Sequence, residues 1–190
     1  MATIHVLDET TINKIAAGEV VERPASVVKE LIENSIDADA TSIEVEIGEG
    51  GSAYMRITDN GKGMTEEDAR LAVLRHATSK IQKVEDLFDI ASLGFRGEAL
   101  ASIASVSHFV LTTRTVDQEL GTRILIDGGT FTDCIPYGAA PGTTIEVKEL
   151  FFNTPARRKF LKTERTESSK IQDIVGKLAL SNPHIAFKLT

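Results

Sequence analysis

Three side chains suited to acid–base or metal chemistry recur at helical spacing in one segment of the chain. Glu30, Asn34 and Asp37 are four and three residues apart, so on a helix they share one narrow stripe. A carboxylate can take a proton from water, and an amide oxygen is a ligand that magnesium accepts. The stripe borders an apolar face formed by Val27, Val28, Leu31, Ile32, Ser35 and Ile36. The alternative is a solvated polar face on an amphipathic helix.

A second candidate is the segment Asp59-Asn60-Gly61-Lys62-Gly63, which follows an alternating apolar run. A carboxylate only accepts hydrogen bonds, so Asp59 can hold the exocyclic amine of a base, and glycines let backbone approach a flat ligand closely. Asn-Gly between two strands would instead indicate a hairpin turn. A capped helix start, Thr65-Glu66-Glu67-Asp68, comes next, however, so the local order is strand, glycine loop and helix.

Glycines also open a predicted helix in Gly94-Phe95-Arg96-Gly97-Glu98-Ala99-Leu100. Unpaired backbone N–H groups and the positive end of the helix dipole make such a start suitable for phosphate, although a simple loop-to-helix junction is the default explanation. The chain has no Gly-x-x-x-x-Gly-Lys-Ser/Thr sequence, which excludes a Walker-type phosphate loop.

Apolar periodicity and turn residues indicate the elements that position these motifs. The central helix is expected to begin at Arg23-Pro24 and to end near Asp39-Ala40, followed by an antiparallel hairpin of two alternating runs. A first helix from Asp8 to Gly18 is expected before it. Further strands are expected at 109–113, 122–127, 131–135, 143–148 and 185–189, and helices at 84–90, 100–104 and 171–180.

Together, the three motifs resemble those of the ATPase superfamily of gyrase, heat-shock chaperones, histidine kinases and MutL. Three longer runs narrow the resemblance to the DNA mismatch repair protein MutL and its relatives: residues 94–100, 15–21 (Ile-Ala-Ala-Gly-Glu-Val-Val) and 152–160 (Phe-Asn-Thr-Pro-Ala-Arg-Arg-Lys-Phe). The match extends over nearly the whole chain. It implies an α+β fold, a two-layer α/β sandwich of the Bergerat type, whose mixed, largely antiparallel sheet is covered on one face by helices and carries an ATP lid.

The resemblance also implies roles for single residues. Glu30 would be the general base that activates the attacking water, and Asn34 would be the magnesium ligand. Asp59 would accept a hydrogen bond from the adenine amine, with Thr144 of the Gly142-Thr143-Thr144 sequence supporting it through water or directly. The implied ATP contacts besides Asp59 and Thr144 are Asn34, Ala38, Gly63, Met64, Thr78, Gly94, Phe95, Arg96, Gly97 and Leu100.

The activity implied by this resemblance is slow, magnesium-dependent ATP hydrolysis in a mismatch repair clamp. ATP binding would drive N-terminal dimerisation, as a homodimer or with a paralogue, and residues 3–7 match an arm that reaches to the partner subunit. A mismatch-recognition protein and DNA are the other implied partners. An ATP-gated scaffold with negligible turnover, or another member of the superfamily such as a gyrase-type subunit, is the alternative.

Residues 1–190 are expected to form one ATP-binding domain, an N-terminal fragment of a longer chain, because the sequence ends on a strand-like run with no terminating signal. In the family a second domain supplies a lysine to the terminal phosphate, and a C-terminal region dimerises. Both would be absent here, so weak hydrolysis by the fragment is expected.

Composition argues against several other classes of protein. A chain of 190 residues with 42% hydrophobic residues can bury one core, and the net charge of −7 argues against a surface built as a whole for nucleic acid. One cysteine allows no internal disulfide, and no apolar run is long enough to span a membrane. A cytoplasmic protein, nuclear in a eukaryote, is therefore expected.

The segment 156–166 is a local exception to the acidic balance. It carries five cations, Arg157, Arg158, Lys159, Lys162 and Arg165, against one acid, Glu164. A solvated helix face and a contact with the phosphate backbone of DNA explain this run equally well.

Overall fold

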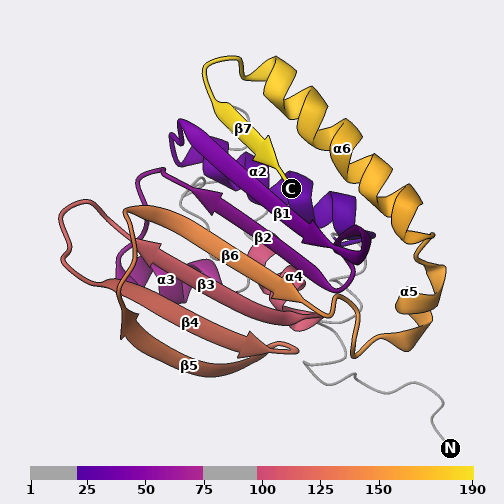
Figure 1. Cartoon of the computed structure of the whole chain (residues 1–190). Coiled ribbons are helices and arrows are strands. Elements are labelled where there is room, and N and C mark those ends of the chain that lie inside the picture. Colours follow the sequence, from indigo (N-terminus) through magenta and orange to yellow (C-terminus); the bar gives the residue numbers. More distant parts are fainter. Residues whose placement is uncertain (1–20, 75–97) are drawn as a thin grey trace, which may run out of the picture.

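A seven-stranded sheet is the base of the fold in residues 21–74 and 98–190, the part of the chain that the computed structural model describes (Figure 1). The spatial order of the strands is β5-β4-β3-β6-β2-β1-β7. Among these strands β1 and β7 pair in parallel and the other neighbours pair antiparallel, as expected for a mixed sheet. The strands are β1 Ser42–Gly48, β2 Tyr54–Asp59, β3 His108–Arg114, β4 Gly121–Asp127, β5 Thr130–Tyr137, β6 Gly142–Lys148 and β7 Ala186–Leu189.

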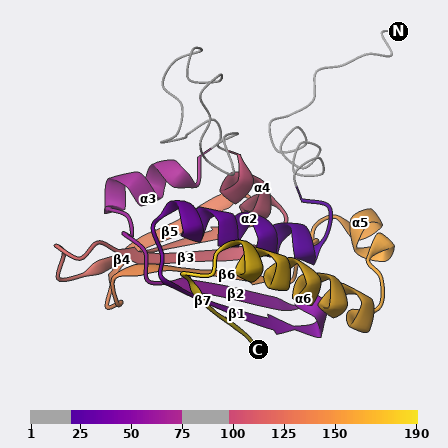
Figure 2. The same ribbon diagram turned by 90° about the horizontal axis from the view of Figure 1, so that it is seen from above.

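Helices form the second layer. Figure 2 shows α2, α3 and α4 on one face of the sheet, with α6 running beside α2. The opposite face carries no helix of the described part, so the expected two-layer α+β architecture is confirmed. The helices are α2 Pro24–Asp37, the short 3-10 helix η1 Glu49–Gly51, α3 Glu66–Ala72, α4 Ala99–Ser105, α5 Pro155–Phe160 and α6 Glu164–Ser181.

The core lies between these two layers because each strand turns every second side chain toward the helices. From α2, the apolar positions that the sequence places on one face are buried against the sheet. Burying one such side chain contributes about 1.5–3 kcal/mol, which fixes the rotation of α2 about its axis. The buried residues are Val27, Val28, Leu31 and Ile32 of α2 and Ile43, Val45, Met55, Ile57, Phe109, Leu111, Ile124, Ile145 and Val147 of the sheet.

Two expected helix boundaries are wrong. Helix α2 ends at Asp37 rather than near Asp39-Ala40, because Asp39 adopts a left-handed backbone conformation with φ of 59°. Helix α6 begins at Glu164 rather than Ile171, with Thr163 as its N-cap accepting from Thr166 N. Its first two turns are polar, so apolar periodicity alone does not reveal them.

The predicted helix at 8–18, the arm at 3–7 and the helix at 84–90 lie outside the described residues. The described helices include none that combines the length and the apolar character needed to cross a membrane.

Candidate nucleotide site

Asp59, the last residue of β2, presents a buried carboxylate at the boundary between the sheet and α2. Its side chain accepts three hydrogen bonds: Ser35 Oγ lies 2.8 Å from Oδ2, while Gly61 N and Thr143 N lie 2.9 and 3.3 Å from Oδ1. Burial raises the pKa of Asp59 above its ordinary value, and the three hydrogen bonds oppose that rise. The result is a preformed acceptor at a site where 9% of the residue's surface is exposed.

Strand alternation explains why this carboxylate faces the helices. Met55 and Ile57 point into the core, and Asp59 has the same parity, so its side chain leaves the sheet on the same side. In the ladders Asp59 lies opposite Ile43 of β1 and opposite Thr143 of β6. A short polar residue on the core face of α2, Ser35, reaches it from above.

Thr143, and not its neighbour Thr144, lies opposite Asp59 in the sheet. Thr144 alternates with the buried Ile145, so its side chain lies on the sheet face away from the helices, where Thr144 Oγ1 is 3.2 Å from Thr58 Oγ1. Thr143 is instead the residue that lies opposite Asp59 and hydrogen-bonds it through its backbone N–H. The alternation of the strand, counted back from Ile145, is the signal that could have separated the two threonines.

Thr143 also has acceptor capacity for a ligand. Thr113 Oγ1 lies 3.0 Å from Gly142 O and accepts from Met64 N at 2.9 Å. Thr113 has one hydroxyl proton, which it donates to Gly142 O. In the 3.0 Å contact between Thr113 Oγ1 and Thr143 Oγ1, Thr143 is then the donor and Thr113 the acceptor. The lone pairs of Thr143 Oγ1 then remain available on the same face of the sheet as the Asp59 carboxylate.

Two glycines around this site are required by the protein's own backbone. Gly63 has φ of 67°, and a Cβ there would lie 2.0 Å from Arg114 O. Gly142 has φ of 118°, and its Cβ would lie 2.1 Å from Asp59 O. L side chains rarely adopt these conformations, so glycine is needed at both positions before any ligand arrives.

The polar stripe of Glu30, Asn34 and Asp37 lies beside the core face of α2, the helix that also carries Ser35. Glu30, Asn34 and Asp37 are half-buried, as expected for positions beside the core face. The side-chain amide of Asn34 makes no hydrogen bond to any other residue of the described part. Ala38, at the end of the stripe, accepts from Lys62 N at 2.9 Å through its carbonyl, which ties the end of α2 to the glycine loop after Asp59.

Sequence reasoning missed two polar residues of α2. Ser35 was expected to be a core residue, and its hydrogen bond to Asp59 depends on a partner 24 positions away. Glu33 is buried with 5% of its surface exposed, and its Oε1 lies 2.7 Å from Lys29 Nζ one turn earlier. The Lys29 and Glu33 spacing of four residues signals that ion pair, but nothing in the sequence signals the burial.

A magnesium ion fits this site only together with a nucleotide. The described residues contain no group of three or more His, Cys, Asp or Glu that could hold a metal. Asn34 supplies one neutral oxygen donor, and magnesium commonly completes its coordination with phosphate oxygens and water. The donor set therefore fits a metal that enters with the phosphates.

The remaining candidate contacts divide into two groups. Met64 and Leu100 are described, and both are partly buried against the hydrophobic core. The others lie outside the described residues: Thr78, Gly94, Phe95, Arg96 and Gly97.

Comparison with known proteins identifies the family. Residues 22–127, more than half of the chain, match the family described as histidine kinase-, DNA gyrase B- and HSP90-like ATPase. The chain belongs to this ATPase family. The fold described above agrees with this assignment, and the expected membership of the superfamily is confirmed.

Within the ATPase family, the chain is similar to DNA mismatch repair proteins named MutL. It is 60% identical over 188 residues to the MutL protein of Caldanaerobacter subterraneus subsp. tengcongensis, covering 99% of this chain and 32% of that protein. It is 57% identical over 187 residues to that of Xanthomonas axonopodis pv. citri, covering 98% of this chain and 30% of that protein. The chain thus spans about a third of the length of these relatives.

Two solved structures show the same fold. The Aquifex aeolicus MutL ATPase domain complexed with ADP is 39% identical and has a TM-score of 0.70, with 90% of this chain and 60% of that chain covered. The N-terminal domain of a DNA repair protein is 30% identical with a TM-score of 0.78, covering 94% of this chain and 51% of that chain. The predicted resemblance to the N-terminal ATPase region of MutL is confirmed.

Proposed function

We propose that the site around Asp59 binds the adenine of ATP and that the chain hydrolyses ATP with magnesium as part of a mismatch repair protein. The observation that carries this proposal is the buried Asp59 carboxylate, which is held by Ser35, Gly61 and Thr143 on the sheet face that α2 covers. An exocyclic amine is a donor that matches such an acceptor. The ADP complex of the similar Aquifex aeolicus domain supports a nucleotide as the ligand.

Asp59 and Thr143 would recognise the base. The carboxylate would accept one hydrogen bond from the adenine amine, and the free lone pairs of Thr143 Oγ1 would accept a second one, directly or through water. Gly63 and Met64 would border the base and sugar. The fixed backbone at Gly63 gives this recognition a rigid frame, because no other residue fits its conformation.

Glu30 would act on the attacking water. As the water oxygen bonds to the γ-phosphorus and the bond to the β–γ bridging oxygen breaks, the Glu30 carboxylate would take the water proton and later pass it to solvent. Asn34, one turn further along α2, would give its amide oxygen to magnesium. When bound, that ion would neutralise charge on the phosphate oxygens.

Further contacts with the triphosphate are assigned by the family resemblance. Among these triphosphate contacts, Leu100 at the start of α4 lies in the described part of the chain. Ala38 would contact the nucleotide near the glycine loop to which its carbonyl is bonded. The other proposed contacts are Thr78, Gly94, Phe95, Arg96 and Gly97.

We further propose that the chain is the N-terminal part of a longer protein, which ATP would drive to dimerise at its N-terminus, with a second copy or a paralogue, in a clamp that works with a mismatch-recognition protein and DNA. The name "DNA mismatch repair protein MutL" of the relatives supports this role. It would place the protein in the cytoplasm, or in the nucleus of a eukaryote.

The basic run supports a weak, sequence-independent DNA contact. Arg157 donates to Val21 O at 3.3 Å, and Arg158 pairs with Glu149 at 3.4 Å, so these two cations serve internal contacts. The other three cations are exposed and form no ion pair within residues 21–74 and 98–190: Lys159, Lys162 and Arg165.

Replacement of Glu30 by Gln tests the catalytic assignment. We expect phosphate release in single turnover to fall about 100-fold or more, as for loss of a general base, while the affinity for a non-hydrolysable ATP analogue stays within about twofold. Turnover equal to that of the wild type would contradict the role of Glu30.

The second candidate function, an ATP-gated scaffold with negligible turnover, is tested by mass in solution. Dimer formation with the analogue in a wild-type chain that releases no phosphate would favour gating. Dimer formation that accompanies measurable turnover would favour the ATPase cycle, and a monomer under all conditions would contradict ATP-driven dimerisation of this region.

A further inference from the structure

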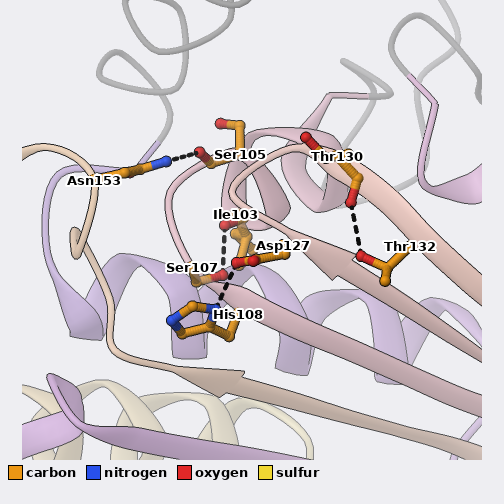
Figure 3. Close-up of polar contacts among 8 residues, drawn as sticks. All are labelled: Ile103, Ser105, Ser107, His108, Asp127, Thr130, Thr132 and Asn153. Atoms are coloured by element: carbon orange, nitrogen blue, oxygen red, sulfur yellow. Dashed lines mark hydrogen bonds and ion pairs between the residues drawn. The ribbon is translucent and has the colours of Figure 1, made fainter.

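The segment Phe152-Asn153-Thr154-Pro155 has no part in the nucleotide site described above, yet it contacts the far end of α4. Asn153 Nδ2 donates a hydrogen bond of 2.9 Å to the carbonyl oxygen of Ser105, the last residue of α4. Figure 3 shows the Asn153 side chain directed at that carbonyl group. The contact joins positions that are 48 residues apart in the sequence.

The carbonyl groups at the C-terminal end of α4 are held from two separate segments, the turn at Gly129 and residues 151–153. A helix leaves its last carbonyl groups without partners inside the helix, so external donors decide where that end lies. Gly129 N, from the turn between β4 and β5, donates to Ala104 O at 2.9 Å, and Phe151 N donates to Val106 O at 2.7 Å. With the bond from Asn153 to Ser105, three consecutive carbonyl groups are occupied. We call residues 151–153 the α4 clamp.

The α4 clamp is itself fixed in place. Phe151 is fully buried in a left-handed conformation with φ of 66°, which a non-glycine residue keeps only when its surroundings determine it. Phe152 stacks on the ring of His108 with a centroid distance of 4.2 Å. Figure 3 shows His108 beside Asp127, with Nδ1 of the ring 2.6 Å from Asp127 Oδ1. The donor of Asn153 therefore sits on a backbone that leaves little freedom to its position.

The other end of α4 carries the proposed triphosphate contact. Leu100 is the second residue of this seven-residue helix, which is about 10 Å long at 1.5 Å per residue. Because both residues belong to this one short helix, a shift of Ser105 at one end would also shift Leu100 at the other.

We propose that Asn153 is a positioning residue for triphosphate binding, acting through α4. This inference rests on the proposed function, in which Leu100 contacts the phosphates. The bond from Asn153 to Ser105 O would hold α4 where Leu100 meets the phosphate chain. Loss of this bond would weaken binding of the phosphates and leave adenine recognition intact.

The α4 clamp and the proposed adenine site lie near opposite ends of strand β3, so a change at one can be separated from a change at the other. Strand β3 runs from His108, which stacks on the α4 clamp, to Thr113, which bonds Thr143 beside Asp59. Five residues of strand span about 17 Å, so the clamp lies well away from the adenine site. A local change at Asn153 therefore cannot act by touching Asp59.

The experiment compares the affinities of variants for two ligands, adenosine and a non-hydrolysable ATP analogue. Asn153→Ala removes the donor, and Asn153→Asp keeps the shape while replacing the donor by an acceptor. Asn182→Ala is the matched control, because Asn182 Nδ2 makes the same kind of bond, 2.9 Å long, to Leu178 O at the end of α6. All variants are measured below the onset of thermal unfolding.

For both Asn153 variants we expect the Kd of the ATP analogue to rise roughly 3- to 30-fold, with the Kd of adenosine unchanged. Asn182→Ala should leave both constants unchanged. An equal rise for adenosine and the analogue, or no rise for either, would overturn the inference while leaving the proposed function intact. Failure of the wild-type chain to bind either ligand would overturn both.

A measurement on the wild-type chain covers the case in which neither Asn153 variant folds. Saturating ATP analogue should slow hydrogen exchange of the Phe151 and Gly129 amides at least threefold more than saturating adenosine does, because phosphate contacts would stabilise α4 and the bonds at its end. Equal exchange with the two ligands would overturn the inference.

Discussion

Ser35 Oγ lies 2.8 Å from Asp59 Oδ2, and this hydrogen bond joins α2 to the end of β2 across the boundary between the two layers. Glu30 and Asn34 lie on the same helix, within five residues of Ser35. The bond therefore fixes the proposed catalytic and metal-binding stripe relative to the proposed adenine acceptor. It connects the two motifs that the sequence presents separately.

Replacing Asp59 by Asn should weaken nucleotide binding without lowering the stability of the fold. The ionised carboxylate is buried at a cost that raises its pKa, so a neutral amide of the same shape should leave the free energy of unfolding unchanged within about 1 kcal/mol, or increase it. The amide oxygen can still accept from Gly61 N, and Ser35 Oγ can accept from the new NH₂ group while donating to Leu31 O.

The same substitution should raise the Kd for ATP or adenosine at least about tenfold, because a donor replaces the acceptor that faces the amine. Chemical denaturation and calorimetric titration measure the two quantities. Loss of stability in proportion to the loss of binding would show instead that Asp59 has only a structural role.

Ionisation of Asp59 should make both stability and nucleotide binding depend on pH, and Ser35→Ala should shift that dependence. The raised pKa of Asp59 means that the folded chain holds a proton at Asp59 more tightly than the unfolded chain does, so ionised Asp59 lowers stability above the unfolded value of 3.8. That cost disappears as the pH falls through the raised pKa. Protonation in the same range removes the carboxylate acceptor, so nucleotide affinity should fall there.

Without the hydrogen bond from Ser35, the pKa of Asp59 should rise further, because that bond favours the charged form. The midpoint of the loss of adenosine affinity on acidification should therefore lie at higher pH in Ser35→Ala than in the wild type. Titration of adenine itself is common to both proteins and cancels in the comparison. Identical midpoints would argue against Asp59 as the titrating group.

The two neighbouring threonines of β6 should respond differently to the same change. Thr143→Val removes the hydroxyl group that faces the helices and contacts Thr113, so we expect adenosine affinity to fall about 3- to 10-fold, as for the loss of one hydrogen bond. Thr144→Val removes a hydroxyl on the opposite face, which bonds Thr58, and should leave affinity within about twofold. Calorimetric titration of both variants makes the comparison, and the reverse order would restore Thr144 as the supporting residue.

Charge reversal in the basic run of residues 156–166 tests the DNA contact. Lys159→Glu and Lys162→Glu change exposed cations that form no ion pair in the described part, whereas Lys177→Glu changes an exposed cation of α6 that pairs with Asp173 and serves as the control. If each lysine contacts one phosphate, the slope of log Kobs against log salt should fall by about 0.9 for each variant. Fluorescence anisotropy with a labelled duplex measures this slope, and equal slopes for all three variants would contradict the contact.

Much of the fold could be predicted because the determining patterns are local. Alternating residues identify β2 and the side on which Asp59 leaves it, and the spacing of Val27, Leu31 and Ser35 identifies the core face of α2. The same counting places Thr143, and not Thr144, on the face of the sheet that carries Asp59, whereas the family resemblance implies Thr144. The polar start of α6 could not be found this way, because periodicity reports only apolar residues.

The sequence by itself determined which residue types occupy each face of each element, and hence the motifs around Glu30 and Asp59. Only the tertiary structure decided which distant residues meet: Ser35 with Asp59, and Asn153 with the carbonyl group of Ser105. The physical reason is that a face is set by the local repeat of one helix or strand. A contact between two elements depends instead on the order of the strands and on how each helix packs across them.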